Sequence, residues 1–562
     1  MQDLKRTKAQ LSREAIERLY IAMRHLFIRG SYKPLGVSGE AMIEALQALE
    51  PEIYGSVNDP EKVELDGLFY VFQRLPHGIE ECRYIKLISR EGFETSNFPS
   101  IVPAKRRRDC YRIDEEQMFV EMTRGRSDIY DILTHLTFLY IEAEKIRSNS
   151  LNHRQEKRRE WLMLEEIVLK EEQQETFNRN VAYTYLSTIL GRTYDETLVA
   201  CNRFSEASKV NSLFHITYWL GRLSMEEYFE KNDREIIFSS SLRENLGHHV
   251  YGELWAQGIK KYLQDHDLLD RPIHIISANL HSVMNSLYGT AARISKKNAS
   301  LEAIAGILSV EQNDDLRDKV ETYALKNGMR LLGDSSGTNI SVQLFDISKI
   351  DLTTLPPEIA YDKDYLQNTR PVIIVMNYAF GEQAYETMDE LLKPYDWKQD
   401  KIKLDIQSIS IMGKAGILDG DKGDIMIPDA HVFEGTADNY PFENDFSVKD
   451  FQGHGIKVVG GPMITVMGTS LQNKDILRYF KLSSWQVIGL EMEGAHYQKA
   501  IQAASKIRNS ISPNVILRYA YYASDNPLMT GKTLASGPLG LDGVKPTYLI
   551  TQKILERIFL KN

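Results

Sequence analysis

Cysteine is scarce in this chain, which has three cysteines among 562 residues, Cys82, Cys110 and Cys201. They are odd in number and widely spaced, and they form neither a Cys-x-x-Cys pair nor a zinc-binding Cys/His pattern. A disulfide framework and a thiolate metal centre are therefore excluded as organising elements of the fold. Free thiols of this kind suit a reducing compartment, so we expect a cytoplasmic protein without a bound metal.

Long apolar runs and surplus positive charge are missing as well. No uninterrupted apolar segment approaches the length that crosses a bilayer, and the charged segment Met1–Leu19 lacks the apolar core of a signal peptide. The 68 Lys and Arg against 78 Asp and Glu give a formal net charge of -10. Because this leaves no excess of cations to neutralise phosphates, we expect neither a nucleic acid nor a membrane as partner.

What the chain has is the composition of a folded globular protein, with 43% hydrophobic and 26% charged residues. Its length exceeds that of a single hydrophobic core, which predicts two domains. In residues 1–268, apolar side chains recur three and four positions apart, as in Ala15–Phe27 and Ile129–Tyr140, a spacing typical of helices. We therefore expect an all-α domain over residues 1–268.

The pattern changes in residues 269–562, where short apolar runs alternate with helical patterns. Strands are expected at 271–278, 340–347, 372–376, 404–412, 424–427, 456–459, 464–467, 486–490 and 514–523. Helices are expected at 279–294, 301–326, 382–392, 474–480, 491–507 and 547–559. Several strands are apolar throughout, which indicates a central sheet covered by helices on both faces. We therefore expect an α/β domain over residues 269–562.

Two of these strands end on acidic residues. The apolar run Val487–Leu490 leads into Glu491 and Glu493, and a β-rich run leads into Ser524 and Asp525. Strand ends at one edge of an open α/β sheet are where such folds bind ligands. One carboxylate can hold sugar hydroxyls while another donates a proton, which cleavage of a ribose–base bond requires. The alternatives are an acid favoured by a helix dipole at Glu493 and a cap or turn residue at Asp525.

Two segments with glycine also follow strands. Asn377–Ala384 contains Gly381, and a helix that starts there can present free backbone N–H groups to an anion. An ordinary strand-to-helix connection is the alternative. Gly413–Gly416 reads Gly-Lys-Ala-Gly, which we interpret as a turn whose small residues let the backbone approach a ligand. A tight turn that needs positive φ is the alternative there.

In this order, the motifs resemble those of the nucleoside phosphorylase and nucleosidase superfamily, whose fold is a mixed central sheet flanked by helices. The resemblance covers about half of the chain, from Arg271 to the end. The matching segments are the opening strand and turn to Asn279, Asn377–Ala384, Gly413–Gly416, Gly423–Ile427, Glu491–Ala495 and Ser524–Asp525. Ser524–Leu528 is most similar to the AMP nucleosidase branch, which also carries an extra N-terminal domain.

The resemblance implies roles for individual residues. Asp525 would protonate N7 of a purine or hold that proton, Glu493 would accept hydrogen bonds from the ribose 2′- and 3′-hydroxyls, and Met492 would pack under the sugar. Further substrate contacts are expected from Asn279, Gly413, Gly416, Glu491 and Ser524, and phosphate contacts from Asn377, Gly381 and Arg518.

Three positions depart from the family pattern. His281 stands where nucleosidases that act on methylthioadenosine have a glutamate that activates water; a neutral imidazole can accept that proton, and a surface or core histidine is the alternative. Lys414 replaces a small hydroxyl residue and can bind a 5′-phosphate, or it is a solvated lysine. Gly468–Leu471 has no aromatic to stack on a base, so Phe433 or Tyr440 is expected to supply that face.

The resulting expectation is an enzyme that cleaves the N-glycosidic bond of a purine nucleoside or nucleotide, preferably by hydrolysis. A phosphorylase with inorganic phosphate as co-substrate and a non-catalytic nucleotide sensor are the alternatives, and no other cofactor is expected. The resemblance also implies a homo-oligomer. In the N-terminal domain, the basic run Lys105–Arg108 either docks a polyphosphate or nucleotide or pairs with neighbouring acids such as Asp114.

Overall fold

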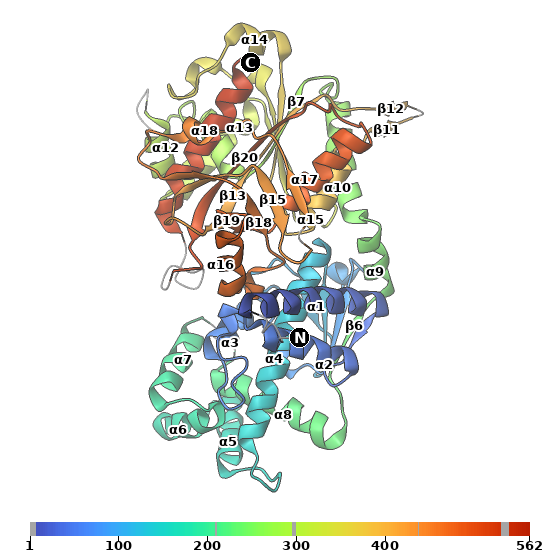
Figure 1. The fold of residues 1–562 in the computed structure, drawn as a ribbon, viewed down its shortest axis with the longest axis vertical. Coiled ribbons are helices and arrows are strands. Elements are labelled where there is room, and N and C mark those ends of the chain that lie inside the picture. The colour runs from blue at the N-terminus through green and yellow to red at the C-terminus, as the bar shows by residue number, and fades with distance from the viewer. Residues whose placement is uncertain are drawn as a thin grey trace, which may run out of the picture. The chain divides into compact units, whose positions relative to one another are not determined.

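The computed structural model describes residues 7–207, 211–294, 299–398, 400–436, 438–529 and 539–561. The chain divides into two compact units, Met1–His248 with Gly468–Ile476, and His249–Met467 with Leu477–Asn562 (Figure 1). Helix α10, Val250–Asp265, lies in the second unit, whereas the sequence analysis placed it before the domain boundary. Within the described ranges, none of the helices combines the length and apolar character that crossing a bilayer requires.

The first unit contains a six-stranded sheet, which corrects the expectation of an all-α domain. Its strand order is β1-β6-β2-β5-β4-β3. The strands are β1 Ser31–Tyr32, β2 Tyr84–Ile88, β3 Ser100–Ile101, β4 Cys110–Arg112, β5 Gln117–Glu121 and β6 Glu235–Phe238. They are short, and the parallel pair of β2 and β6 joins segments far apart in the sequence. The helical periodicity on either side of such short strands hid the sheet from the sequence analysis.

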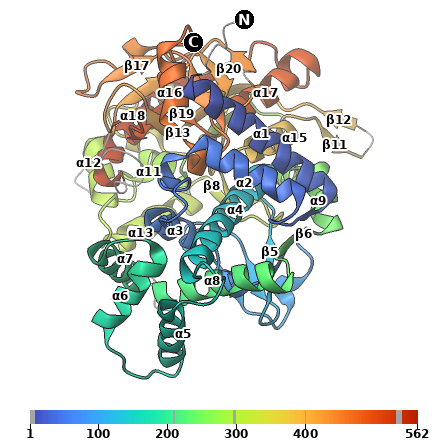
Figure 2. The same cartoon turned by 60° about the horizontal axis from the view of Figure 1, so that its bottom comes forward.

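Helices make up most of the rest of the first unit, as the apolar spacing predicted. They are α1 Lys8–Arg29, α2 Val37–Leu49, α3 Leu65–Phe72, α4 Gly125–Ser150, α5 Arg159–Glu172, α6 Arg179–Leu190, α7 Tyr194–Ala207, α8 Leu213–Glu230 and α9 Ser240–Gly247. Helix α4 is buried along nearly its whole length and packs against α8 (Figure 2). It is the central helix of this unit.

The basic run of the first unit is paired within that unit. Arg106 donates to the two carboxylate oxygens of Asp131 at 2.9 and 2.8 Å. Arg108 donates to Asp128 at 2.8 Å and to Asp131 at 2.5 Å. Both acids come from α4 rather than from the segment around Asp114. The structure therefore supports internal pairing of these arginines.

The second unit is built on a mixed sheet of 12 strands around β13, Ile406–Ile417. Strands β7 and β20 run parallel to β13, and β19 runs antiparallel to it. The other strands are β7 Ile273–Ser277, β8 Met329–Leu332, β9 Val342–Asp346, β10 Val372–Met376, β14 Ile425–Ile427, β15 Ala430–Phe433, β16 Asn439–Pro441, β17 Val458–Gly460, β18 Met463–Thr465, β19 Gly489–Glu491 and β20 Ile516–Asp525. A separate pair consists of β11 Tyr395–Trp397 and β12 Asp400–Ile402. The expected mixed α/β sheet is confirmed, whereas β8, β15 and β16 were not expected.

Helices cover both faces of this sheet, as the uniformly apolar strands predicted. Along β10, Ile373 and Val375 belong to one core cluster and Val372, Ile374 and Met376 to another, because successive side chains of a strand point to opposite faces. The first cluster takes in α11 Leu280–Tyr288, α12 Leu301–Leu308, α13 Asp314–Lys326 and α18 Val544–Phe559, on the left of the sheet in Figure 1. The second takes in α10, α15 Gln383–Leu391 and α17 Gly494–Gln502, on the right. Two further helices are α14 Lys363–Thr369 and α16 Lys474–Leu482.

Candidate active site

The two acidic motifs flank one glycine of β13. Gly416 pairs with Leu490 of β19 on one side and with Asp525 of β20 on the other. Neighbouring strands lie about 4.8 Å apart, so the backbones of the two motifs are about 10 Å apart across β13. The end of β19 that leads to Glu491 and Glu493 is therefore close to the end of β20 at Asp525.

The segment Gly413–Gly416 is not the turn that the sequence analysis expected. It lies inside β13, and neither glycine has a positive φ. The strand continues through it because β20 pairs with β13 as far as Asp525. A Cβ on Gly416 would lie 2.6 Å from Cδ2 of Leu490. A side chain at this position would therefore have to displace the side chain of Leu490.

The edge of β13 that faces β7 and β19 has a gap in its pairing. Strand β7 pairs with β13 as far as Ser277, opposite Ile411, and β19 takes over at Gly416. Because β7 is parallel to β13 and β19 antiparallel, the carboxyl ends of β7 and β19 point toward each other along this edge. The hydroxyl of Ser277, the last residue of β7, lies 3.0 Å from that of Tyr497 in α17, the helix that follows β19. Among the described strands, none pairs with Met412–Ala415 on this side, which leaves that stretch open to loops and side chains.

Glu491 holds the start of α17. Its buried carboxylate accepts hydrogen bonds from the Thr465 hydroxyl, from the backbone N–H of Glu493 at 2.5 Å and from that of Gly494. Burial, with the nearby charge of Glu493, raises the pKa of Glu491 to about 8. The acid that satisfies the N-terminus of this helix is therefore Glu491, since Glu493 makes no side-chain cap bond to it.

Glu493 is half-buried and contacts the loop that follows β10. Its Oε1 accepts a hydrogen bond of 3.0 Å from the backbone N–H of Gly381, which has a φ of 54°. The N–H group that was expected to bind a phosphate thus points at a carboxylate of the protein. Asn377 is occupied as well, since its Oδ1 accepts from the Tyr378 N–H at 2.9 Å and its own N–H donates to the Ser341 carbonyl. The loop positions Glu493 rather than presenting an empty anion site.

Asp525 is 2% exposed. Its Oδ1 accepts a hydrogen bond of 2.7 Å from the Ser524 hydroxyl, whereas Oδ2 is buried without a hydrogen-bond partner among the described residues. Burial raises the pKa of Asp525, and Ser524 and Lys422 only partly oppose that shift. A buried carboxyl with a raised pKa and one unsatisfied oxygen is suited to carry a proton and to donate it.

A bulge in β20 sets the position of this carboxyl. Ala415 pairs with Ala523 and Gly416 with Asp525, so Ser524 is an extra residue on β20. The Ser524 hydroxyl lies 3.2 Å from the Ala415 carbonyl oxygen. A bulge of this kind redirects the side chains that follow it, which here are those of Asp525 and of the buried Asn526.

Asp525, Gly416 and Leu490 lie side by side on three neighbouring strands, and Glu491, the residue after Leu490, extends this row of cross-strand neighbours to the next strands. Phe433 pairs with Thr465, and Thr465 with Glu491. The Phe433 ring is half-buried and lies edge-on to His496 at 4.8 Å and to Tyr440 at 5.9 Å between ring centres. Phe433, expected as a stacking residue, therefore lies on the same row as the acidic motif. Met492, which follows Glu491, is half-buried.

Asn279, His281 and Lys414 lie at the gap in the pairing of β13. Asn279 caps α11, because its Oδ1 accepts from the Ser282 N–H at 2.8 Å. His281 and Lys414 are exposed. Partial burial lowers the pKa of His281, and the charges of Lys414 and Arg317 lower it further. The shift favours the neutral form of the His281 imidazole, which has a cation beside it.

Arg518, expected to bind phosphate, does not lie close to Asp525 or the other candidate residues. It lies seven residues before Asp525 on β20, which is about 23 Å at 3.3 Å per residue. Its buried guanidinium donates to Oδ2 of Asp445 at 2.7 Å. Arg518 is thus an internal partner of Asp445 near the start of the strand.

Two residues of the site carried no signal in the sequence. Thr465 donates to Glu491 and accepts from the Ala495 N–H at 3.0 Å. His431 is fully buried, and a Cβ on Gly494 would overlap its ring. Both residues act on the start of α17 from strands that are distant in the sequence, so no local motif marks them.

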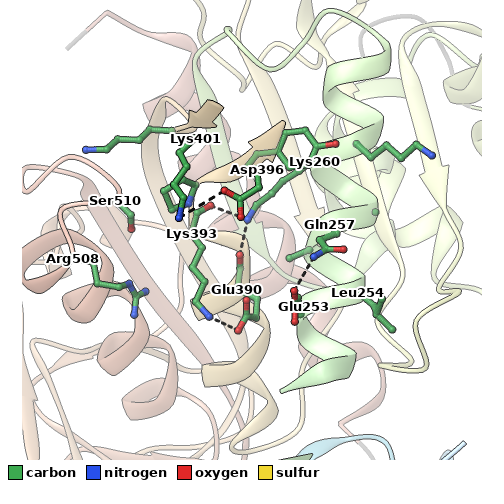
Figure 3. A pocket seen from close by; sticks show the side chains of 16 residues that line it. Glu253, Leu254, Gln257, Lys260, Glu390, Lys393, Asp396, Lys401, Arg508 and Ser510 are labelled. Carbon is green, nitrogen blue, oxygen red and sulfur yellow. Dashed lines mark hydrogen bonds and ion pairs between the residues drawn. The ribbon is translucent and has the colours of Figure 1, made fainter. Parts of the chain in front are cut away.

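A cavity of about 710 Å³ lies elsewhere in the second unit, between α10, the end of α15 and the pair β11–β12 (Figure 3). None of the candidate site residues lines it. The buried Lys260 donates to the carbonyls of Glu390 and Lys393 at 2.7 and 2.8 Å, and Lys393 pairs with the Glu390 carboxylate at 2.5 Å. The polar groups drawn in Figure 3 thus largely satisfy one another.

Solved structures that match the chain over about half of its length are nucleosidases, hydrolases and phosphorylases. The 5′-methylthioadenosine/S-adenosyl homocysteine nucleosidase of Campylobacter jejuni is 10% identical, with a TM-score of 0.31, and the match covers 51% of this chain and 99% of that one. Futalosine hydrolase of Helicobacter pylori is 12% identical, with a TM-score of 0.28, and the match covers 51% of this chain and 98% of that one. Uridine phosphorylase of Schistosoma mansoni is 11% identical, with a TM-score of 0.31, and the match covers 53% of this chain and 91% of that one. This coarse likeness carries no argument about reaction or substrate.

No curated protein matches the chain. A family model described as "Family of unknown function (DUF6909)" matches residues 40–301 and 307–560. The chain therefore belongs to this family of unknown function, and the case for its activity depends on the site itself.

Proposed function

We propose that the second unit is an enzyme that hydrolyses the N-glycosidic bond of a purine nucleoside or nucleotide. The observation that carries this proposal is the pairing of Gly416 with both Leu490 and Asp525. It puts a carboxyl with a raised pKa and an unsatisfied oxygen about 10 Å from a second acidic motif. That separation suits a ligand made of a sugar and its attached base.

The chemistry assigns different tasks to the two acids. Cleavage of the bond builds positive charge on the ribose and negative charge on the leaving base. Asp525, whose pKa is raised by burial, donates its proton to the base as the bond breaks. Glu493, held by the Gly381 N–H, accepts hydrogen bonds from the ribose hydroxyls and stabilises the cationic sugar. Glu491 holds the N-terminus of α17 through its hydrogen bonds, and its task is to position that helix rather than to bind the ribose or the base.

Two observations favour water as the nucleophile. His281 has a lowered pKa, so its neutral imidazole can accept a proton from an attacking water. Arg518, the candidate ligand for a phosphate co-substrate, is paired with Asp445 and lies away from the two acidic motifs.

Lys414 is exposed and lies near His281. Its ammonium group can bind the 5′-phosphate of a nucleotide substrate as a point charge.

The test is to incubate the purified full chain with AMP, adenosine, inosine and methylthioadenosine, with and without inorganic phosphate, and to separate free base by chromatography. We expect free base without a requirement for phosphate, and its loss in Asp525→Asn and Glu493→Gln. Asp364→Asn, an exposed acid on α14, is the matched control and keeps full activity. Saturable nucleotide binding without any free base would reject the enzyme in favour of a sensor.

A further inference from the structure

A cluster of potential metal ligands lies in the first unit and shares no residue with the candidate active site. Glu80 and Glu81 come from the short 3-10 helix η2, Ile79–Glu81, and His215 comes from the first turn of α8. One nitrogen or oxygen atom from each of the three side chains lies within 4.8 Å of the other two. Imidazole nitrogen and carboxylate oxygen are ligands that divalent transition metals accept.

The side chains of the cluster already converge. His215 Nε2 lies 2.8 Å from Oε1 of Glu81 and 4.0 Å from Oε1 of Glu80. Each carboxylate is held from outside the cluster: Arg112 donates to Oε2 of Glu81 at 3.0 Å, and the amide of Asn211 donates to Oε1 of Glu80. Partners of this kind orient metal ligands, so both carboxylates are held in place before any ion binds.

Glu80 has a buried oxygen that nothing satisfies. Its Oε2 has no hydrogen-bond partner among the described residues, although the residue is 2% exposed. Arg112 offsets the charge of Glu81, so the uncompensated oxygen is Oε2 of Glu80, and a buried carboxylate of this kind is costly without a cation.

We propose that Glu80, Glu81 and His215 bind a divalent transition-metal ion, with Zn²⁺ as the best fit. Zinc accepts both imidazole nitrogen and carboxylate oxygen, and three protein ligands leave a fourth position for water. Bound zinc ties η2 to the start of α8, two segments that are far apart in the sequence, so it stabilises the first unit. This wide separation is also why no ligand spacing is visible in the sequence.

The experiment uses the full chain with any purification tag removed, stripped with a chelator and dialysed. Titration with ZnCl₂ by calorimetry, and zinc content by mass spectrometry after gel filtration, should give about one zinc per chain. His215→Gln and Glu80→Gln should lose it, whereas His153→Gln, an exposed histidine, should keep it. Asn211→Ala should weaken binding by about 10- to 100-fold, as loss of an outer-shell partner does.

Proton release gives a second readout. Metal ligands must be deprotonated, so zinc binding should release protons: the measured heat should vary with the ionisation enthalpy of the buffer, and the affinity should fall as the pH is lowered. Replacement by Co²⁺ in the unmodified chain should give a spectrum without a thiolate charge-transfer band, because the neighbouring Cys82 thiol is not a ligand. That measurement does not depend on any variant folding.

Three results would overturn the proposal. The first is a stripped chain that binds no zinc under these conditions. The second is zinc retained at full affinity by both His215→Gln and Glu80→Gln. The third is a thiolate band in the Co²⁺ form together with loss of zinc in Cys82→Ser, which would move the ion to a different ligand set.

Discussion

Gly416 of β13 and Asp525 of β20 are cross-strand partners in the sheet of the second unit. On its other side the same glycine pairs with Leu490, next to the acidic motif of β19. The absence of a side chain at Gly416 lets β19 approach, since a Cβ there would lie 2.6 Å from Leu490. A side chain at Gly416 would thus press on Leu490, the residue next to the acidic motif of β19.

Gly416→Ala should therefore separate the motifs. We expect the free energy of unfolding to fall by about 1–3 kcal/mol, as overpacking of a full core does, and the turnover of nucleoside to fall with it. Thermal unfolding and the base-release assay measure the two effects. Gly413→Ala, where a Cβ would meet Tyr378 at an ordinary 3.5 Å, is the control in the same strand and should unfold at the wild-type temperature.

The double variant Gly416→Ala with Leu490→Ala removes the clash and should recover part of the lost activity. If Gly416→Ala by itself were as active as the wild type, the spacing of the motifs would not matter for the reaction.

Asp525→Asn should lower kcat by about 100- to 10,000-fold, the usual contribution of a general acid, with little effect on folding because Oδ2 has no partner to lose. The acid works in its protonated form. Because its pKa is raised, wild-type activity should be high below that pKa and decline as the pH rises through it. The variant should lack this decline in a profile of kcat against pH.

Ser524→Ala provides a graded companion variant. The Ser524 hydrogen bond lowers the pKa of Asp525, so its removal should move the declining limb to higher pH while leaving the enzyme active. If the decline of kcat with pH were unchanged in Ser524→Ala and still present in Asp525→Asn, the titrating group would be a residue other than Asp525.

Glu491 should make stability depend on pH. Its folded-state pKa of about 8 lies above the ordinary value of 4.5, so the folded state binds this proton more tightly than the unfolded state. The stabilisation is full below about pH 4.5 and is lost as the pH rises toward 8. Thermal midpoints measured between pH 5 and 8 should therefore fall more steeply for the wild type than for Glu491→Gln, which carries no titrating group. Parallel curves for the two proteins would contradict the raised pKa.

Lys414 should distinguish nucleotides from nucleosides. If its ammonium holds a 5′-phosphate, Lys414→Met should raise KM for AMP by about 10-fold, which is the loss of one charge-assisted hydrogen bond at an exposed site. The KM for adenosine should not change, since it has no phosphate. Lys506→Met, another exposed lysine of the second unit, serves as the control. An equal change for both substrates would exclude phosphate recognition by Lys414.

Much of the second unit could be predicted from local patterns. The uniformly apolar run of β10 indicated a strand buried on both faces, and the structure places its alternate residues in two different core clusters. The strand ends at Glu491 and Asp525 also followed from hydrophobic runs that stop on acids. The sheet of the first unit could not be predicted in this way, because β2 and β6 are short and find each other across a long stretch of helices.

By itself, the amino-acid sequence determined most of the strands and helices of the second unit and the acidic residues at two strand ends, because periodicity and strand termination are local properties of a chain. The tertiary structure decided what each of these residues does. In the folded chain, Glu491 accepts hydrogen bonds from a helix N-terminus, Glu493 accepts one from the backbone N–H of Gly381, and Arg518 pairs with Asp445. Burial and hydrogen-bond partners come from segments distant in the sequence, so they arise only when those segments pack together.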